Sequence, residues 1–301
     1  MAAAKSRKPV QQMSIQKFEA TFPNEDACKD YLVARRWPNG VRCPRCKNPE
    51  VYELKAREYH WQCHKCDEDG YRFSLYVGTI YENTNMPLKT WFRVIHMMVT
   101  SKKGVSALQV HRTIGTGSYR TAWYMCHRIR AGLLDPKEKL GGVVEMDETY
   151  IGGKDRNRHW DKRSGGTGGK GSKKEPILGA VSRKGNVVAR AIDSVDIPTV
   201  ERFVQHVVSD KVSTLVTDDA KVYRKLGSKY PHEVIKHSDK QYVVGAIHTN
   251  TIEGFWSIFK RGEVGTFHKV SAKYMSLYVR EFEFRYNNRN NPDIFAAAFQ
   301  S

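Results

Sequence analysis

The sequence of 301 residues has no apolar run that approaches the roughly 20 residues of a membrane-spanning helix. Its first residues, MAAAKSRKPVQQ, also lack the apolar stretch of a secretory signal peptide. We therefore expect neither a membrane protein nor a secreted one, and the sequence predicts a cytoplasmic protein. The length predicts two or three domains.

Acidic residues are scarce relative to basic ones. There are 32 Asp and Glu residues against 50 Lys and Arg residues, which gives a formal net charge of +18. Such an imbalance suits a polyanionic partner, and nucleic acid is favoured because no membrane signal is present. Ribosomal and membrane-surface proteins are equally basic, so the charge indicates a polyanion without identifying it.

Cysteines are also few, six in all, but four of them follow a regular pattern. The pairs Cys43-x2-Cys46 and Cys63-x2-Cys66 are separated by 16 residues, which is typical of structural zinc sites. The intervening VYELKAREYHWQC alternates like a hairpin that returns the second pair to the first. Two disulfides, the alternative, do not fit an intracellular protein. We therefore expect a zinc ribbon whose four thiolates bind one structural Zn²⁺ and leave no open coordination position.

After Pro87 the pattern becomes helical. PLKTWFRVIHMMVTS, SALQVHRTIG and SYRTAWYMCHRIRAGL predict three helices, the last capped by Ser118. The last two, separated by a short glycine-containing turn, are typical of a helix-turn-helix that binds DNA. An ordinary bundle with a solvated basic face remains the alternative. The expected recognition helix carries four basic residues: Arg120, His127, Arg128 and Arg130.

Two predicted strands carry acidic residues. VVEMDETYIGGK predicts a strand with Asp147 near its middle, and a buried carboxylate is costly unless it is paired or bound to a metal. STLVTDD predicts a second strand that ends in Asp218 and Asp219. Two acids at a strand end indicate either a helix cap or a metal site.

A later segment, HTNTIEGFWSIFKRG, predicts a helix with a third acid. Asn250, Glu253 and Lys260 share one face of it, while aromatic and aliphatic residues supply a face that packs. Glu253 alone reads as an ordinary solvated charge. It gains interest from the two acids upstream, because three convergent carboxylates suit hard divalent cations.

The zinc pattern followed by VEMDETYIGGK, VTDD, HTNTIEGFWSIFKRG, GTFHKVS and EFEFRYNNR closely resembles bacterial insertion-sequence transposases of the DDE class with an N-terminal zinc ribbon. The resemblance implies an α/β fold with an RNase H-like catalytic domain, a mixed five-stranded sheet flanked by helices. By motif position it implies Asp147, Asp218 and Glu253 as the acids and Lys260 as the lysine of the late motif. Asp219 stands where a glycine is usual, and Asn250 is the alternative third residue in related groups, so both stay open.

The resemblance also implies an activity and partners. The protein would bind the terminal inverted repeats of its element in double-stranded DNA, cleave them and transfer the 3′-hydroxyl ends to target DNA, with two Mg²⁺ or Mn²⁺ ions. We expect a homodimer or larger assembly associated with the bacterial nucleoid. The alternatives are an RNase H-like nuclease or resolvase without strand transfer, and a noncatalytic zinc-ribbon regulator.

The expected domains are a zinc ribbon with an N-terminal helix at 15–82, a helix-turn-helix region at 86–135 and a catalytic domain at 141–292. A segment rich in glycine and basic residues, 159–176, interrupts the catalytic domain. It is predicted to be a loop that contacts DNA, with a merely solvated loop as the alternative.

Overall fold

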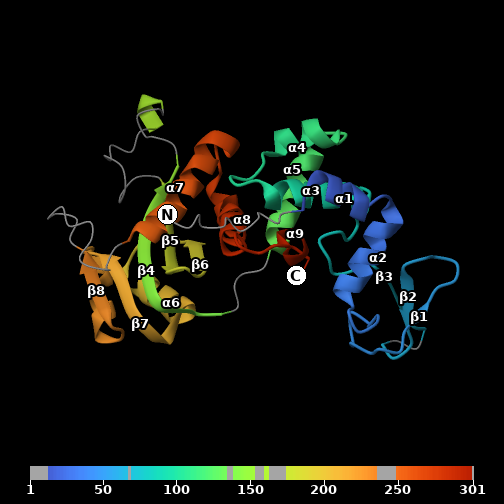
Figure 1. Cartoon of the computed structure of the whole chain (residues 1–301), viewed down its shortest axis with the longest axis horizontal. Helices are drawn as coiled ribbons and strands as arrows, with labels where there is room; N and C mark the ends of the chain where they lie inside the picture. The colour runs from blue at the N-terminus through green and yellow to red at the C-terminus, as the bar shows by residue number, and fades with distance from the viewer. Residues whose placement is uncertain are drawn as a thin grey trace, which may run out of the picture. The chain divides into compact units, whose positions relative to one another are not determined.

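The computed structural model describes residues 13–66, 69–133, 138–152, 159–162, 174–235 and 249–299. The chain divides into two compact units (Figure 1). Unit 1 is formed by Met1–Leu134 together with Asn290–Ser301, and unit 2 by Asp135–Arg289. None of the helices within the described ranges is long and apolar enough to cross a membrane.

Unit 1 combines a small sheet with a group of helices. Its strands form an antiparallel sheet in the order β1-β2-β3. Its elements are α1 (Ile15–Thr21), α2 (Glu25–Arg36), β1 (Tyr52–Glu53), β2 (His60–Cys63), β3 (Tyr71–Ser74), α3 (Leu88–Thr100), α4 (Ala107–Ile114), α5 (Tyr119–Gly132) and α9 (Ile294–Ala297).

An aromatic cluster joins the two chain segments of unit 1. Phe22 packs edge-on against Phe92 of α3, with ring centroids 5.0 Å apart, and Phe295 of α9 lies 5.5 Å from Phe22. Phe299 lies 4.7 Å from Phe92. Aromatic rings bury much apolar surface, so this cluster attaches the C-terminal residues to the N-terminal helices.

Unit 2 is built on a five-stranded sheet with helices on both faces. Its elements are β4 (Leu140–Ile151), η2 (Trp160–Lys162), β5 (Glu175–Ser182), β6 (Val187–Ala191), α6 (Ile197–Val207), β7 (Val208–Asp218), η3 (Lys221–Ser228), β8 (His232–Ile235), α7 (Asn250–Gly262), the π-helix η5 (Glu263–Phe267), η6 (Ala272–Tyr274) and α8 (Met275–Asn287).

The strands lie in the order β6-β5-β4-β7-β8. β5 pairs antiparallel with both β4 and β6, whereas β7 pairs parallel with β4 and β8 parallel with β7. The first strand of the unit is thus central and the fourth lies beside it. This is the mixed five-stranded sheet expected of an RNase H-like fold.

Alternation along the strands separates two apolar cores. Val144 and Met146 of β4 belong to the core shared with α6 and η3. Ile151 of β4 belongs to the other core, where the apolar residues of α7 and α8 lie. Because successive strand residues face opposite sides, the odd-numbered positions of β4, including Asp147, share the face covered by α7.

Candidate active site and metal centre

Asp147 and Asp218 meet on the two central strands. β4 and β7 pair in parallel with Glu145 opposite Val216, and two residues further along each strand this register brings Asp147 level with Asp218. Single oxygen atoms of Asp147, Glu148 and Asp218 lie within 4.8 Å of one another. Asp219 is exposed and is not a member of this group. The structure therefore brings together the first acid and Asp218, with Glu148 as an additional carboxylate.

The cluster is electrostatically unfavourable without a cation. Burial, together with the negative charges of Glu148, Asp218 and Glu253, raises the pKa of Asp147 to about 7. A divalent cation would reverse this effect, since opposite charge favours the ionised carboxylate. The donor set is made only of carboxylate oxygens, which are the ligands that hard cations such as Mg²⁺ prefer. These residues therefore fit a divalent metal site.

Glu148 is held by a tyrosine from the segment that follows Asp218. Tyr223 of η3 is buried, and its hydroxyl donates a hydrogen bond to the Glu148 carboxylate. Burial raises the pKa of Tyr223 well above its usual value, so the hydroxyl keeps its proton and remains a donor. Glu148 faces the η3 side of β4 while its oxygen still reaches the acid cluster.

The third expected acid, Glu253, lies in the first turn of α7 and is exposed. It is not part of the group within 4.8 Å, but it is near enough to raise the pKa of Asp147. Its carboxylate accepts a hydrogen bond of 3.0 Å from the hydroxyl of Thr249. Asn250 is the first residue of α7, and Lys260 lies seven residues after Glu253, about 10 Å along the helix. Both are exposed.

A glycine lets α7 lie close to the strand pair that carries Asp147. Gly179 of β5 is the direct partner of Asp147. A Cβ atom placed on Gly179 would lie 2.5 Å from the indole of Trp256 and 3.2 Å from Ile252. No side chain larger than hydrogen fits there unless the Trp256 ring or α7 moves. The position of the helix that carries Glu253 thus depends on this residue.

Two further acids of the site, Glu148 and Glu145, were not predicted from the sequence. Glu148 directly follows Asp147, and the presence of two adjacent acids in an apolar strand could have indicated it. Glu145 shares the α7 face of β4 with Asp147 and is fully buried. Its partners on α7 are more than 100 residues away, and no local pattern indicates them.

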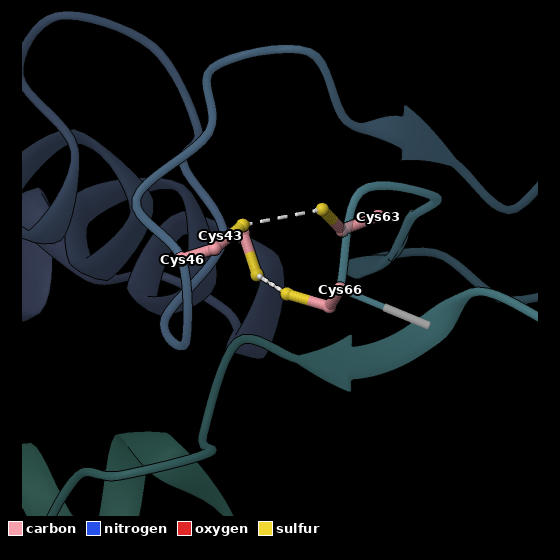
Figure 2. Close-up of side chains that lie close together, drawn as sticks. All are labelled: Cys43, Cys46, Cys63 and Cys66. Atoms are coloured by element: carbon pink, nitrogen blue, oxygen red, sulfur yellow. Dashed lines mark hydrogen bonds between the residues drawn. The ribbon is translucent and has the colours of Figure 1, made fainter. Parts of the chain in front are cut away.

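The four cysteines of the predicted ribbon converge in unit 1 (Figure 2). Their sulfur atoms all lie within 4.8 Å of one another, with Cys43 and Cys66 3.4 Å apart and Cys46 and Cys63 3.6 Å apart. A tetrahedral site with Zn–S bonds of about 2.3 Å separates its sulfurs by about 3.8 Å. All four are free thiols, so the structure excludes the disulfide alternative. The arrangement fits a structural Zn²⁺.

The pKa values of two thiols in this close group are shifted in opposite directions. A backbone N–H of Asn48 and hydrogen bonds from neighbouring thiols lower the pKa of Cys46 to about 7. The hydrogen bond shared with Cys46 raises the pKa of Cys66 to about 12. Four thiolates cannot coexist at this distance without a cation, and Zn²⁺ supplies the charge that allows all four to ionise.

Comparison with known proteins agrees with both sites. Residues 139–287 match the family described as "ISXO2-like transposase domain", and residues 23–69 match the family described as "Transposase zinc-ribbon domain". The chain belongs to the ISXO2-like transposases. It is a DDE-type transposase with an RNase H-like catalytic unit and an N-terminal zinc ribbon, and unit 2 of the transposase holds the acid cluster.

A protein of Halobacterium salinarum, titled as an uncharacterized protein in transposable element ISH50, is similar to the transposase. The two are 27% identical over 278 residues, covering 88% of this chain and 92% of the relative. Because this relative is archaeal, the expected bacterial source has no support. A chain in the intasome of simian T-cell lymphotropic virus, solved with PP2A regulatory subunit B56 gamma, matches with a TM-score of 0.29 and 12% identity. The match covers 64% of the transposase and 65% of that chain.

In unit 1 of the transposase a short turn joins α4 to α5, and binding of DNA by this pair of helices stays a prediction. α4 ends at Gly115, which adopts the left-handed conformation with φ 73°. Ser118 caps α5 by accepting a hydrogen bond of 3.1 Å from the N–H of Thr121. The glycine and the serine are the residues that the sequence pattern required for this turn.

Two of the four basic residues expected on the recognition helix are buried, and a third, Arg128, is half-buried. Arg130 is 1% exposed and His127 is 7% exposed. Arg128 donates hydrogen bonds of 3.0 Å to the carbonyl of Glu82. For His127 and Arg130 the expectation was wrong, because helical spacing does not reveal which side chains in the C-terminal half of α5 are covered by the rest of the unit. Only Arg120 keeps an exposed position.

The exposed large side chains of α5 lie in its N-terminal half. Tyr119 is 51% exposed and Tyr124 is 56% exposed, with Arg120 between them. Arg112 of α4 is also exposed. This aromatic and basic surface is the part of the helix-turn-helix that a ligand can reach.

Most of the predicted loop 159–176 lies outside the described residues, as does Lys173 within it.

Proposed function

We propose that this transposase binds the ends of its mobile element, cleaves them and joins the freed ends to target DNA. In the first step water attacks the phosphorus at the end of the element, and the bond to the 3′ oxygen breaks to leave a 3′-hydroxyl. In the second step this hydroxyl attacks a phosphorus of target DNA and displaces the 3′ oxygen of the target strand. The two-step scheme comes from the family resemblance.

One observation carries the proposal: Asp147, inside β4, and Asp218, at the end of β7, meet on neighbouring parallel strands. They come from sequence segments that are 71 residues apart, and burial together with the crowding of neighbouring carboxylates raises the pKa of Asp147. A fold tolerates such crowding where function requires it, because perturbed carboxylates concentrate at functional sites.

Asp147, Asp218 and Glu253 would hold two Mg²⁺ or Mn²⁺ ions. When bound, such a pair stabilises the attacking and the leaving oxygen of an in-line displacement at phosphorus. The assignment of Glu253 is supported by its place in the first turn of α7, near enough to the acids for its charge to raise the pKa of Asp147. Lys260, two turns further along the same exposed face, would bind a phosphate of the DNA strand.

Glu148 competes with Glu253 for the third ligand position, and Asn250 remains the family's alternative. Tyr223 already holds Glu148, so we assign it to shaping the cluster. Glu253→Gln should then reduce cleavage by about 10³-fold or more, whereas Glu148→Gln should cost much less. The opposite order would assign the position to Glu148. If Glu253→Gln cleaved at the wild-type rate and Asn250→Ala were inactive, the third ligand would be Asn250.

The N-terminal half of α5 would recognise the element ends. In helix-turn-helix proteins the N-terminal residues of the second helix contact base edges in the major groove. Tyr119 and Arg120 occupy these positions and are exposed. The net charge of +18 supports additional, sequence-independent binding to phosphates.

Two ends must be held together for coupled joining, so we propose that a dimer or larger assembly of the transposase acts. The site of action is the element's own DNA, and we expect the protein at the chromosome, in the cytoplasm.

The direct test uses purified full-length protein and labelled duplexes that carry the element's terminal repeat. We expect binding, 3′-end cleavage and joining to an unlabelled plasmid in the presence of Mg²⁺ or Mn²⁺. Cleavage without joining would favour the nuclease alternative. Binding without cleavage would favour the regulator.

A further inference from the structure

The buried carboxylate of Glu145 is saturated with donors from another part of the chain. Glu145 is 0% exposed and lies two residues before Asp147 on the same face of β4. The N–H and the hydroxyl of Thr251 donate to it at 2.8 Å each, and the N–H of Ile252 donates at 3.2 Å. The Nε of Arg183 donates at 2.8 Å.

α7 lacks the cap that its own sequence should supply. Thr249 occupies the N-cap position, but its side chain accepts no hydrogen bond from the helix. Its hydroxyl donates to Glu253 instead. A capping side chain normally accepts from the N–H of the second or third helical residue, and these residues are Thr251 and Ile252. Glu145 therefore caps α7 from the neighbouring strand, where the helix dipole also favours a negative charge.

Apolar packing, including the contact of Gly179 with Trp256, sets how closely α7 approaches the sheet, but not its rotation or its axial position. Its buried residues, Ile252, Phe255, Trp256 and Phe259, pack against the sheet and α8, and such contacts have no direction. Hydrogen bonds to two successive amide groups do have direction. They fix the first turn of the helix, and Glu253 is the next residue in that turn.

We propose that Glu145 is a positioning residue, which holds the start of α7 so that Glu253 faces the Asp147 carboxylate. The inference rests on the proposed function, because it assigns Glu145 to the assembly of the same metal site. Glu145 and Asp147 lie on one strand, so the link from the cap to the first acid is only two residues long. Arg183 completes the arrangement: its N–H donates to Val143 of β4 at 3.0 Å while its side chain balances the charge of Glu145.

The test measures binding of Mn²⁺ to the full-length protein by titration calorimetry, with no DNA and no turnover. Glu145→Gln keeps the size of the side chain but offers one oxygen acceptor in place of two and loses the charge. We expect it to weaken Mn²⁺ binding about 10- to 100-fold, the range for residues that orient metal ligands. Hydrogen exchange at the amides of Thr251 and Ile252 should accelerate in the same variant.

Glu283→Gln is the matched control. Glu283 is also a buried glutamate, 1% exposed, that ties a helix of unit 2 to the sheet. It accepts from Arg190 at 2.9 Å and from the N–H of Ala189 at 3.4 Å, but its helix is α8. We expect Glu283→Gln to lose thermal stability while Mn²⁺ binding stays at the wild-type level.

Equal Mn²⁺ affinity of Glu145→Gln and wild type would overturn the inference and leave Glu145 a purely structural residue. If Glu145→Gln does not fold, Thr251→Val decides, because it removes only the hydroxyl hydrogen bond. It should weaken Mn²⁺ binding about fivefold, the equivalent of one hydrogen bond, and an unchanged affinity would overturn the inference. Failure of the wild type to bind Mn²⁺ would instead contradict the proposed function.

Discussion

Gly179 lies directly opposite Asp147 in the antiparallel pairing of β5 with β4, and the indole of Trp256 occupies the space above it. A residue with no functional group thus determines how closely α7 approaches the strand that carries the first acid. Gly254, on α7 itself, has open space where its Cβ would be. The two glycines allow the contact to be separated from general effects of adding a methyl group.

Gly179→Ala should destabilise unit 2 by about 1–3 kcal/mol, because the added Cβ overlaps the Trp256 ring. Gly254→Ala should stabilise it by up to about 1 kcal/mol, because alanine favours the helix. Urea unfolding of both variants measures the difference. If the two substitutions changed the midpoint equally, Trp256 would not be in close contact with Gly179.

Zinc removal should unfold the ribbon without abolishing the metal chemistry of unit 2. Cys43→Ser removes one of four thiolates, and we expect zinc content to fall from one ion per chain to near zero. Cys28→Ala, which alters a buried cysteine outside the cluster, should retain one zinc. Elemental analysis after purification without chelators makes the comparison. A zinc-free wild type would refute the assignment.

Specific DNA binding should depend on the exposed half of α5. Arg120→Ala should reduce the preference for element ends over random duplex by about 1–3 kcal/mol. Arg128→Ala should instead lower the melting temperature, because its guanidinium holds the carbonyl groups of Thr79 and Glu82. Binding to both duplexes, measured at several salt concentrations, separates the two effects. If Arg120→Ala lowered the affinity for element ends and for random duplex equally, α5 would not be the recognition helix.

The metal-free protein should become less stable as the pH rises from about 4 to about 7. The folded pKa of Asp147, about 7, is above its ordinary value of 3.8, so in this window the folded state holds a proton that the unfolded chain has released. Stability from this group is full below pH 4 and is lost as the pH rises through 7, by up to about 4 kcal/mol. Asp147→Asn should flatten the profile measured by thermal unfolding. Mg²⁺ should stabilise the wild type most above pH 7, and a profile shared by wild type and variant would contradict the shift.

Local patterns predicted much of this molecule. The ribbon follows from two short cysteine pairs and an alternating segment, and each needs only a few neighbouring residues to be recognised. Alternation and strand ends also revealed Asp147 and Asp218. The sequence could not separate Asp218 from Asp219, because only the parallel register with β4 shows which of them faces Asp147.

Long-range contacts account for what the sequence did not reveal. The burial of Arg130 depends on how α5 packs against the rest of unit 1, and helical spacing is silent on this point. Glu145 reads as one acid among several in VVEMDETY, while its role comes from amide groups that lie 106 and 107 residues later. A capping interaction between two elements leaves no spacing rule in the sequence.

The central claim is that Asp147 and Asp218 together hold the catalytic metal ions. The most direct measurement is cleavage and joining of labelled element ends by Asp147→Asn, Asp218→Asn and Asp219→Asn at equal DNA binding. Asp219 is adjacent to Asp218 and exposed, so it is the matched control. We predict that Asp147→Asn and Asp218→Asn each lose at least about 10³-fold in activity, with little further loss when combined, and that Asp219→Asn stays near the wild-type rate. Near wild-type cleavage by Asp218→Asn, or an inactive Asp219→Asn, would contradict the account.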